Sequence, residues 1–288
     1  MAVWRGLGFT ALVLLGVLVA ALRTMDARRE RPVTADLHVP PAFAVAREFD
    51  FGRYRLSWRG QAFQVHPRGR PEKVLWGAAG GFLAAGIGRA EDGGRWRGGE
   101  LRDRRELLCR EQSLEAFERL GSRLLLKGHL RCTDGSLSTY ALTLQDDGER
   151  GLVLSVTLGE PRLNRLYLAW HRDTDERFFG FGERSGAYDL SGRRLAIAGA
   201  GSQQLAATEA DDRNGGAPLG FYFTSRMRAF YSQSAAYQVF DLRDLQRVGL
   251  EVHEGRLQAR IYNGDSQEVL LARQASVVGA LPMQPASK

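Results

Sequence analysis

Apolar and polar residues alternate with a period of two along much of the chain after residue 50. Tyr54, Leu56 and Trp58 alternate with polar residues, and the segment FQVHP from Phe63 continues the pattern after an Arg-Gly break. Successive side chains of a strand point to opposite faces, so this period indicates strands buried on one face. The pattern predicts a strand, a turn and a second strand over residues 50–67.

The same alternation of apolar and polar residues recurs as far as Tyr262. Two alternating runs, RLLLKGHLRC and STYALTLQ, flank the dipeptide Asp134-Gly135, which is a strong hairpin signal. Helical spacing occurs only at SQEVLLARQASVV, residues 266–278, where Ser266 is a candidate N-cap. Many strands at short spacing predict an all-β protein with a large antiparallel β-sandwich or barrel.

Two stretches depart from the alternation, and we expect both to be loops. Residues 77–99 contain nine glycines, and residues 197–218 are rich in Ala, Gly, Ser, Gln and Asp. Long loops on a rigid β scaffold commonly carry function.

The N-terminus carries an uncharged apolar run of 16 residues, Leu7–Leu22. Its length suits either a signal anchor or a cleaved signal peptide, and it predicts an N-terminal apolar helix. Four arginines that follow it favour a cytoplasmic body by the positive-inside rule, whereas a single N-terminal apolar run favours export. We expect a cell-envelope protein that is either anchored in the membrane by this segment or exported to the periplasm.

The composition shift after this run predicts four parts. They are a signal anchor or signal peptide (1–22), a linker rich in Arg, Pro and Ala (23–46), a β-sandwich domain (47–265) and a C-terminal helix and tail (266–288).

The charge does not point to nucleic acid, although the net charge is +7 and the pI is near 9.8. Only Lys73, Lys127 and Lys288 are lysines, and the many arginines are interspersed with Asp and Glu. No recognition-helix, zinc-ligand or base-stacking motif accompanies them, so we expect no nucleic-acid partner, no metal and no cofactor. The cysteines Cys109 and Cys132 lie on adjacent strand-like segments, which leaves open a cross-strand disulfide or two free thiols.

The segment ERFFGFGERSGAYDLSGRR, residues 176–194, has the most distinctive chemistry. Gly180 and Gly182 interrupt a run of phenylalanines, which indicates that the backbone must pass close to something there. Glu183 and Asp189 suggest a paired-carboxylate site, but we favour the simpler interpretation that Glu183 caps the turn or pairs with a neighbouring arginine.

This segment belongs to an ordered series of motifs. Asn164-Arg165-Leu166 comes first, then the run from Asp175 to Glu183, then DLSGRR from Asp189 to Arg194, and then PLGFYFTSR from Pro218 to Arg226. The series resembles the N-terminal β-sandwich domain of glycoside hydrolase family 31, the α-glucosidases, α-xylosidases and sulfoquinovosidases. DLSGRR favours the sulfoquinovosidase-like branch, and the whole resemblance covers roughly residues 47–282.

The resemblance implies a galactose-mutarotase-like supersandwich with structural roles for the motif residues Gly180, Gly182, Glu183, Asp189, Arg193 and Arg194. The family's catalytic carboxylates lie on a (β/α)₈ barrel downstream of the sandwich, so it implies no catalytic residue in this chain. Asp211 and Asp212 are the candidates nearest to a family loop that reaches the substrate. The departure from the family pattern after residue 278 leads us to expect a separately encoded or lost barrel.

Three hypotheses remain. The first is a non-catalytic sandwich that supports α-glycoside hydrolysis by a separate glycosidase barrel. The second is a stand-alone envelope module that binds carbohydrate through aromatic residues such as Trp76, Trp96, Tyr188 and Tyr222. The third is a mutarotase-like activity, which requires a histidine and a carboxylate converging in a cleft.

Overall fold

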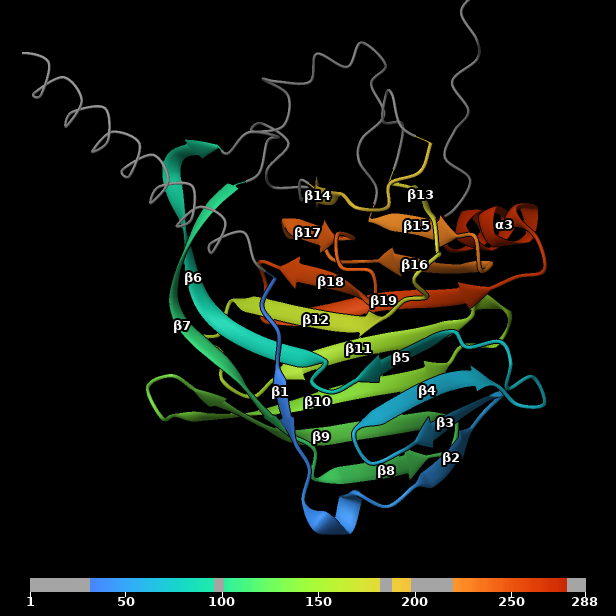
Figure 1. Cartoon of the computed structure of the whole chain (residues 1–288), viewed down its shortest axis with the longest axis horizontal. Coiled ribbons are helices and arrows are strands. Elements are labelled where there is room, and N and C mark those ends of the chain that lie inside the picture. The colour runs from blue at the N-terminus through green and yellow to red at the C-terminus, as the bar shows by residue number, and fades with distance from the viewer. Residues whose placement is uncertain (1–31, 96–100, 182–187, 198–219, 279–288) are drawn as a thin grey trace, which may run out of the picture. The chain divides into compact units, whose positions relative to one another are not determined.

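The alternating segments form strands in the computed structural model of the chain (Figure 1). The structure describes residues 32–95, 101–181, 188–197 and 220–278, without the side chains of residues 91–95 and 102. The described strands are β1 (Asp36–His38), β2 (Arg47–Phe51), β3 (Tyr54–Trp58), β4 (Ala62–Pro67), β5 (Trp76–Ala79), β6 (Leu83–Arg95), β7 (Leu101–Ser113), β8 (Ala116–Leu120), β9 (Arg123–Cys132), β10 (Leu137–Asp146), β11 (Leu152–Leu158), β12 (Arg165–His171), β13 (Phe178–Gly180), β14 (Arg194–Ile197), β15 (Phe221–Thr224), β16 (Arg228–Ser232), β17 (Gln238–Asp241), β18 (Arg247–Val252) and β19 (Arg256–Asn263). The described helices are the short 3₁₀ turns η1 (Pro41–Phe43) and η2 (Gly148–Arg150) and the α-helix α3 (Gln267–Val278).

The described strands form two sheets. Fifteen belong to one large sheet with the order β13-β15-β16-β19-β11-β10-β9-β7-β6-β12-β18-β17-β14, to which β1 and β8 add at the sides of β7 and β9. All of its described pairings are antiparallel except β1 with β7. The small sheet, β2-β3-β4-β5, lies against the part of the large sheet that contains β8 and β9 (Figure 1). The expectation of a mostly β protein with large antiparallel sheets is confirmed.

The main core lies between these sheets because the alternating apolar residues of each turn inward. On β3 the buried residues are Tyr54, Leu56 and Trp58, as the period of two predicts. Aromatic rings join the sheets, with Phe63 of the small sheet at 5.3 Å from Phe82 between centroids. Each fully buried aromatic side chain contributes roughly 1.5–3 kcal/mol, so this interface is a main source of stability.

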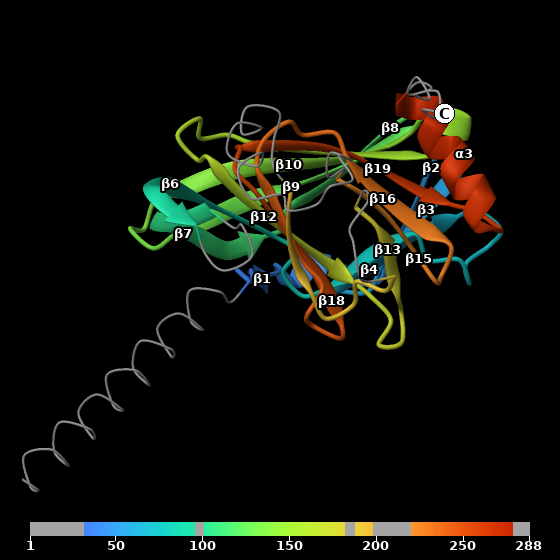
Figure 2. The ribbon, with the colours of Figure 1, turned by 90° about the horizontal axis from the view of Figure 1, so that it is seen from above.

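The Asp134-Gly135 turn is confirmed as a hairpin between β9 and β10. Gly135 has φ +86°, the left-handed conformation that glycine adopts without a steric penalty. Asp134 Oδ1 accepts a hydrogen bond from the backbone N–H of Ser136 at 3.0 Å, which fixes the turn. The predicted helix over residues 266–278 is also confirmed, as α3, and Figure 2 shows it beside β16 and β19.

The prediction of a loop over residues 77–99 is wrong, because the segment contains most of β5 and all of β6. Gly77 and Gly86 lie where a partner strand passes too close for a side chain. A Cβ at Gly77 would lie 2.4 Å from Phe63 O, and one at Gly86 would lie 2.5 Å from Leu107 O. These glycines permit close strand contacts rather than breaking the strands.

The predicted linker over residues 23–46 is ordered in its second half. β1 pairs in parallel with β7, and the indole N–H of Trp58 donates to Phe43 O of η1. The described residues from Thr34 onward therefore belong to one compact unit, and the sandwich begins earlier than residue 47.

The predicted N-terminal helix over Leu7–Leu22 lies outside the described residues. Among those described, no helix is both long enough and apolar enough to cross a membrane.

Cys109 of β7 and Cys132 of β9 are joined in a disulfide. They are opposite each other in the strand pairing, and both are buried. The bond links the β9–β10 hairpin covalently to the middle of the large sheet.

Candidate functional site

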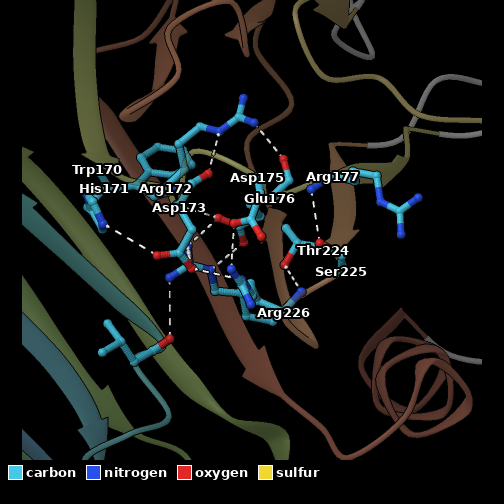
Figure 3. Close-up of polar contacts among 12 residues, drawn as sticks. Trp170, His171, Arg172, Asp173, Asp175, Glu176, Arg177, Thr224, Ser225 and Arg226 are labelled. Atoms are coloured by element: carbon cyan, nitrogen blue, oxygen red, sulfur yellow. Dashed lines mark hydrogen bonds and ion pairs between the residues drawn. The ribbon is translucent and has the colours of Figure 1, made fainter.

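The turn between β12 and β13, residues 172–176, lies at the start of the distinctive motif and is fixed by buried charges (Figure 3). Glu176 is 1% exposed and accepts two hydrogen bonds from the guanidinium of Arg228, one of 2.6 Å from Nε to Oε1. Arg172, 2% exposed, donates to the backbone oxygens of Glu176 (2.6 Å) and Leu242 (3.0 Å). The guanidinium of Arg172 also lies 4.7 Å from the centroid of the Phe178 ring. A buried charge is tolerated only when it is paired or hydrogen-bonded. Glu176 has Arg228 as its ion-pair partner, and Arg172 is bound to backbone oxygens.

Burial by itself raises the pKa of Glu176. The hydrogen bonds and positive charge of Arg228 outweigh this effect, so the pKa of Glu176 lies below its ordinary value of 4.5. Glu176 is therefore ionised at neutral pH and has no proton to donate.

Asp189 holds the beginning of the DLSGRR turn in place. Its Oδ1 accepts hydrogen bonds from the backbone N–H of Phe178 (3.2 Å) and of Ser191 (2.9 Å). Burial alone would raise the pKa of Asp189. The hydrogen bonds that the carboxylate accepts lower the pKa by more than burial raises it, so the pKa of Asp189 lies below its ordinary value. The carboxylate joins the DLSGRR turn to the first residue of β13.

Gly180 explains why a strand of the motif contains glycine. It has φ +115°, and a Cβ there would lie 2.9 Å from Phe221 O and 3.0 Å from Tyr222 Cα. The close approach is to the neighbouring strand β15, within this sheet, rather than to a separate domain. Gly182, Glu183, Asp211 and Asp212 lie outside the described residues.

Arg193 and Arg194 have different surroundings. Arg193 is exposed, whereas Arg194 on β14 lies 3.7 Å from Asp241 and 3.9 Å from Glu251. Arg194 thus contributes to a second charged cluster, which is built on strands β7, β12, β14, β17 and β18.

That second cluster contains Asp103, Glu251 and His253, whose ligand atoms lie within 4.8 Å of one another. The spacing would suit a metal ion, but arginines already occupy the carboxylates. Arg165 makes two hydrogen bonds to Asp103, and Arg105 lies 3.4 Å from Glu251. A cation would have to displace guanidinium groups, so the cluster is better described as an ion-pair network.

Two surface pockets adjoin the 172–176 turn, and His171 and Asp173 line both of them. We call the two pockets together the His171 groove and each pocket one half of it. One half has a volume of about 330 Å³ and the other about 300 Å³. The first half is lined by residues including Ala78, Ala79, Trp170, Thr174, Gln246 and Arg247. The second half is lined by residues including Gln64, Lys73, Val74, Arg226, Met227 and Asn263.

The charged side chains that line the groove are bound to partners inside it or beside it. The Asp173 carboxylate lies 3.2 Å from Nε of Arg226 and 3.8 Å from Nε2 of His171, and these three labelled side chains lie together in Figure 3. Among the other lining cations, Lys73 pairs with Asp265, Arg228 with Glu176 and Arg247 with Asp244, and these three carboxylates lie outside the lining. Counted with these partners, the groove offers fixed donors and acceptors without a large excess of either charge.

Sequence analysis did not identify this groove, because its residues are scattered from Gln64 to Asn263 and none forms a motif with its neighbours. Of the aromatic candidates, Trp76 (1% exposed) and Tyr222 (3%) are core residues, Tyr188 is exposed, and Trp96 lies outside the described residues.

None of the described carboxyl groups with a clearly shifted pKa is suited to act as a general acid at neutral pH. Such a group needs a raised pKa to keep its proton. Every described Asp or Glu whose pKa departs clearly from its ordinary value has it lowered.

The chain was compared with known proteins. No protein-family model and no curated protein matches it. Among solved structures it is similar to a sulfoquinovosidase of glycoside hydrolase family 31 from E. rectale, with 19% identity and a TM-score of 0.51 over 80% of this chain and 32% of that one. A family 31 dextranase from Flavobacterium johnsoniae (10% identity, TM-score 0.35, 81% of this chain and 27% of that one) and a cycloalternan-degrading enzyme from Trueperella pyogenes (14%, 0.34, 78% and 33%) also match.

The chain spans about a third of the length of these structures. The resemblance expected from the motifs is therefore confirmed at the level of the fold: the chain shares the fold of the matched third of a family 31 sulfoquinovosidase.

Proposed function

We propose that this chain is a non-catalytic β-sandwich domain of a carbohydrate-active protein of the glycoside hydrolase family 31 type. The fold shared with the family 31 sulfoquinovosidase over 80% of the chain is the observation that carries this proposal. The motif residues support it, since Gly180, Asp189 and Glu176 each hold strands or turns together. We further propose that the sandwich is a supersandwich of the galactose-mutarotase-like type.

The non-catalytic role rests on the chemistry of the described carboxylates. Glycoside hydrolysis by the usual route needs a protonated carboxylic acid and a second carboxylate on opposite sides of the scissile bond. Glu176 is buried and bound to Arg228, and Asp173 in the groove is bound to Arg226. In this proposal the domain supports hydrolysis of an α-glycoside by a catalytic glycosidase barrel.

The test is hydrolysis of p-nitrophenyl α-glycosides, including the α-glucoside and the α-sulfoquinovoside, by the purified chain. We expect no release of p-nitrophenol above the spontaneous rate. Turnover that persists through further purification would overturn the proposal and direct attention to Asp211 and Asp212.

We also propose export of the chain to the cell envelope, held there by the apolar segment Leu7–Leu22 or released by its cleavage. The disulfide between Cys109 and Cys132 supports this, because disulfides persist in oxidising compartments. Fractionation of cells that express the tagged full chain would test it, and a signal confined to the soluble cytoplasm would contradict it.

A mutarotase-like activity is the second candidate, favoured by the His171–Asp173 pair at 3.8 Å in the groove. It ranks lower because Arg226 binds the same carboxylate, at 3.2 Å, and so competes with His171 for it. Polarimetry of fresh α-D-glucose distinguishes the two, since only a mutarotase accelerates the change in rotation in proportion to the protein added.

A further inference from the structure

We infer that the His171 groove binds a neutral oligosaccharide, with one sugar ring in each half. The inference rests on the proposed carbohydrate-active role and adds a site and a ligand class to it. Its basis is the shape, the charge balance and the polar lining of the groove.

The shape is that of two joined ligand pockets. Each half, at about 330 and 300 Å³, is at the lower end of the volumes of small-molecule sites, roughly 300–1,000 Å³. Since both halves contain His171 and Asp173, they meet at that pair. A ligand of two linked rings can occupy both halves and pass over the shared residues.

The charge balance selects a neutral ligand. Arg226 is bound to Asp173 and to Asp175, the latter at 2.6 Å, and Lys73 is bound to Asp265. A strongly charged ligand would have to break one of these pairs and leave its partner without compensation. Hydroxyl groups both donate and accept, so they can bond to both members of a pair without separating them.

The lining supplies the two kinds of contact that a sugar ring needs. Amide side chains are present in each half, Gln246 in one and Gln64 and Asn263 in the other. Apolar groups stand beside them, Ala78 and Ala79 in the first half and Val74 and Met227 in the second. Polar groups orient a ligand in such a site, and the apolar groups pack against its C–H faces.

A buried donor next to the groove adds an independent observation. Trp76 is 1% exposed, and its indole N–H has no hydrogen-bond partner among the described residues. It lines a small cavity together with Trp170 and His171, both of which also line the groove. The cavity has a volume of about 10 Å³, which is room for one water at most, so the donor can hold a water beside the groove but does not reach a sugar directly.

The experiment is a calorimetric titration of the full chain with glucose, maltose, isomaltose and methyl α-D-glucuronide at millimolar concentrations. We expect at least one of the disaccharides to bind about tenfold or more tightly than glucose, because it gains the hydrogen bonds of the second half. Absence of binding by both disaccharides, or tighter binding of the charged glucuronide than of glucose, would overturn the inference.

Variants locate the site. His171→Ala removes a side chain that both halves share, and it is expected to weaken disaccharide binding about tenfold. His129→Ala is the matched control, because His129 forms a comparable exposed pair with Glu115 at 2.9 Å on β9, away from the groove. Equal affinities for the two variants would overturn the assignment of the site.

If His171→Ala does not fold, Gln246→Ala and Asn263→Ala test one half each. Each should weaken disaccharide binding, and unchanged affinity in both would count against the groove. The result is separable from the hydrolysis test: absent binding removes the groove and leaves the non-catalytic role, whereas hydrolysis removes that role and leaves the groove.

Discussion

Glu176 shows at the residue scale how this chain handles a charge in its interior. The carboxylate is almost completely buried, and Arg228 is its partner on β16. Removing one member of a buried pair costs more than the pair contributes, because the remaining charge is left without compensation.

The first prediction compares two neighbouring carboxylates of the 172–176 region. Glu176→Gln should lower the free energy of unfolding by about 3–5 kcal/mol, because it removes the charge that compensates the largely buried Arg228 and leaves this arginine only a longer ion pair with Asp173, at 3.8 Å. Asp175→Asn is the control, since Asp175 is 78% exposed and pairs with Arg226 at the surface, so it should change stability by about 0–1 kcal/mol. Urea denaturation measures both, and similar losses would contradict the role of burial.

The second prediction concerns pH. The pKa of Glu176 is lower in the folded chain than its ordinary value of 4.5. Its contribution to stability is therefore complete above about pH 4.5 and is lost as the pH falls toward the folded pKa. The difference in unfolding free energy between the natural chain and Glu176→Gln should shrink between pH 5 and pH 3 in urea titrations. A difference that stays constant over this range would mean that Glu176 is not held ionised by Arg228.

At the element scale, the contacts between strands decide where glycine is required. Gly180 and Gly192 both have positive φ, but only Gly180 has neighbouring atoms in the space of a Cβ. The two positions separate the effect of backbone conformation from the effect of strand contact.

The third prediction compares substitutions of Gly180 and Gly192. Gly192→Ala should cost only the conformational penalty, about 1–2 kcal/mol. Gly180→Ala adds a clash with Phe221 O of β15, so we expect a larger loss, about 3 kcal/mol or more. Thermal unfolding followed by circular dichroism compares them, and an equal loss for the two variants would contradict the contact of β13 with β15.

The fourth prediction concerns the bond between β7 and β9. The disulfide closes a loop with a sequence separation of 23, and a loop of this size contributes about 3 kcal/mol. Reduction by dithiothreitol should lower the melting temperature of the natural chain and leave that of the Cys109→Ala, Cys132→Ala double variant unchanged. No effect of reduction on the natural chain would mean that the two thiols are free.

The sequence predicted the strands and the helix better than it predicted the contacts between them. The period of two identified β3, β4, β9 and β10, and helical spacing identified α3, because both depend on residues close in sequence. The glycines of residues 77–99 were misread because their cause lies on other strands, such as Phe63 O opposite Gly77. The groove was missed for the same reason, since Gln64 and Asn263 come together only in the folded chain.

At the scale of the whole molecule, the fold and the polar groove support the proposal of a domain that binds carbohydrate without cleaving it. The large sheet and the small sheet share one core, and the 172–176 turn borders the groove on their surface. Function at this scale depends on the site rather than on the fold, because the same fold serves many functions.

The fifth prediction tests this account most directly, by proton NMR of the full chain with maltose and isomaltose over time. Saturation of the protein signals should transfer to the sugar protons, which reports binding, while no anomeric signals of free glucose appear. Release of glucose at a rate proportional to the protein concentration would contradict the account, as would the absence of any saturation transfer.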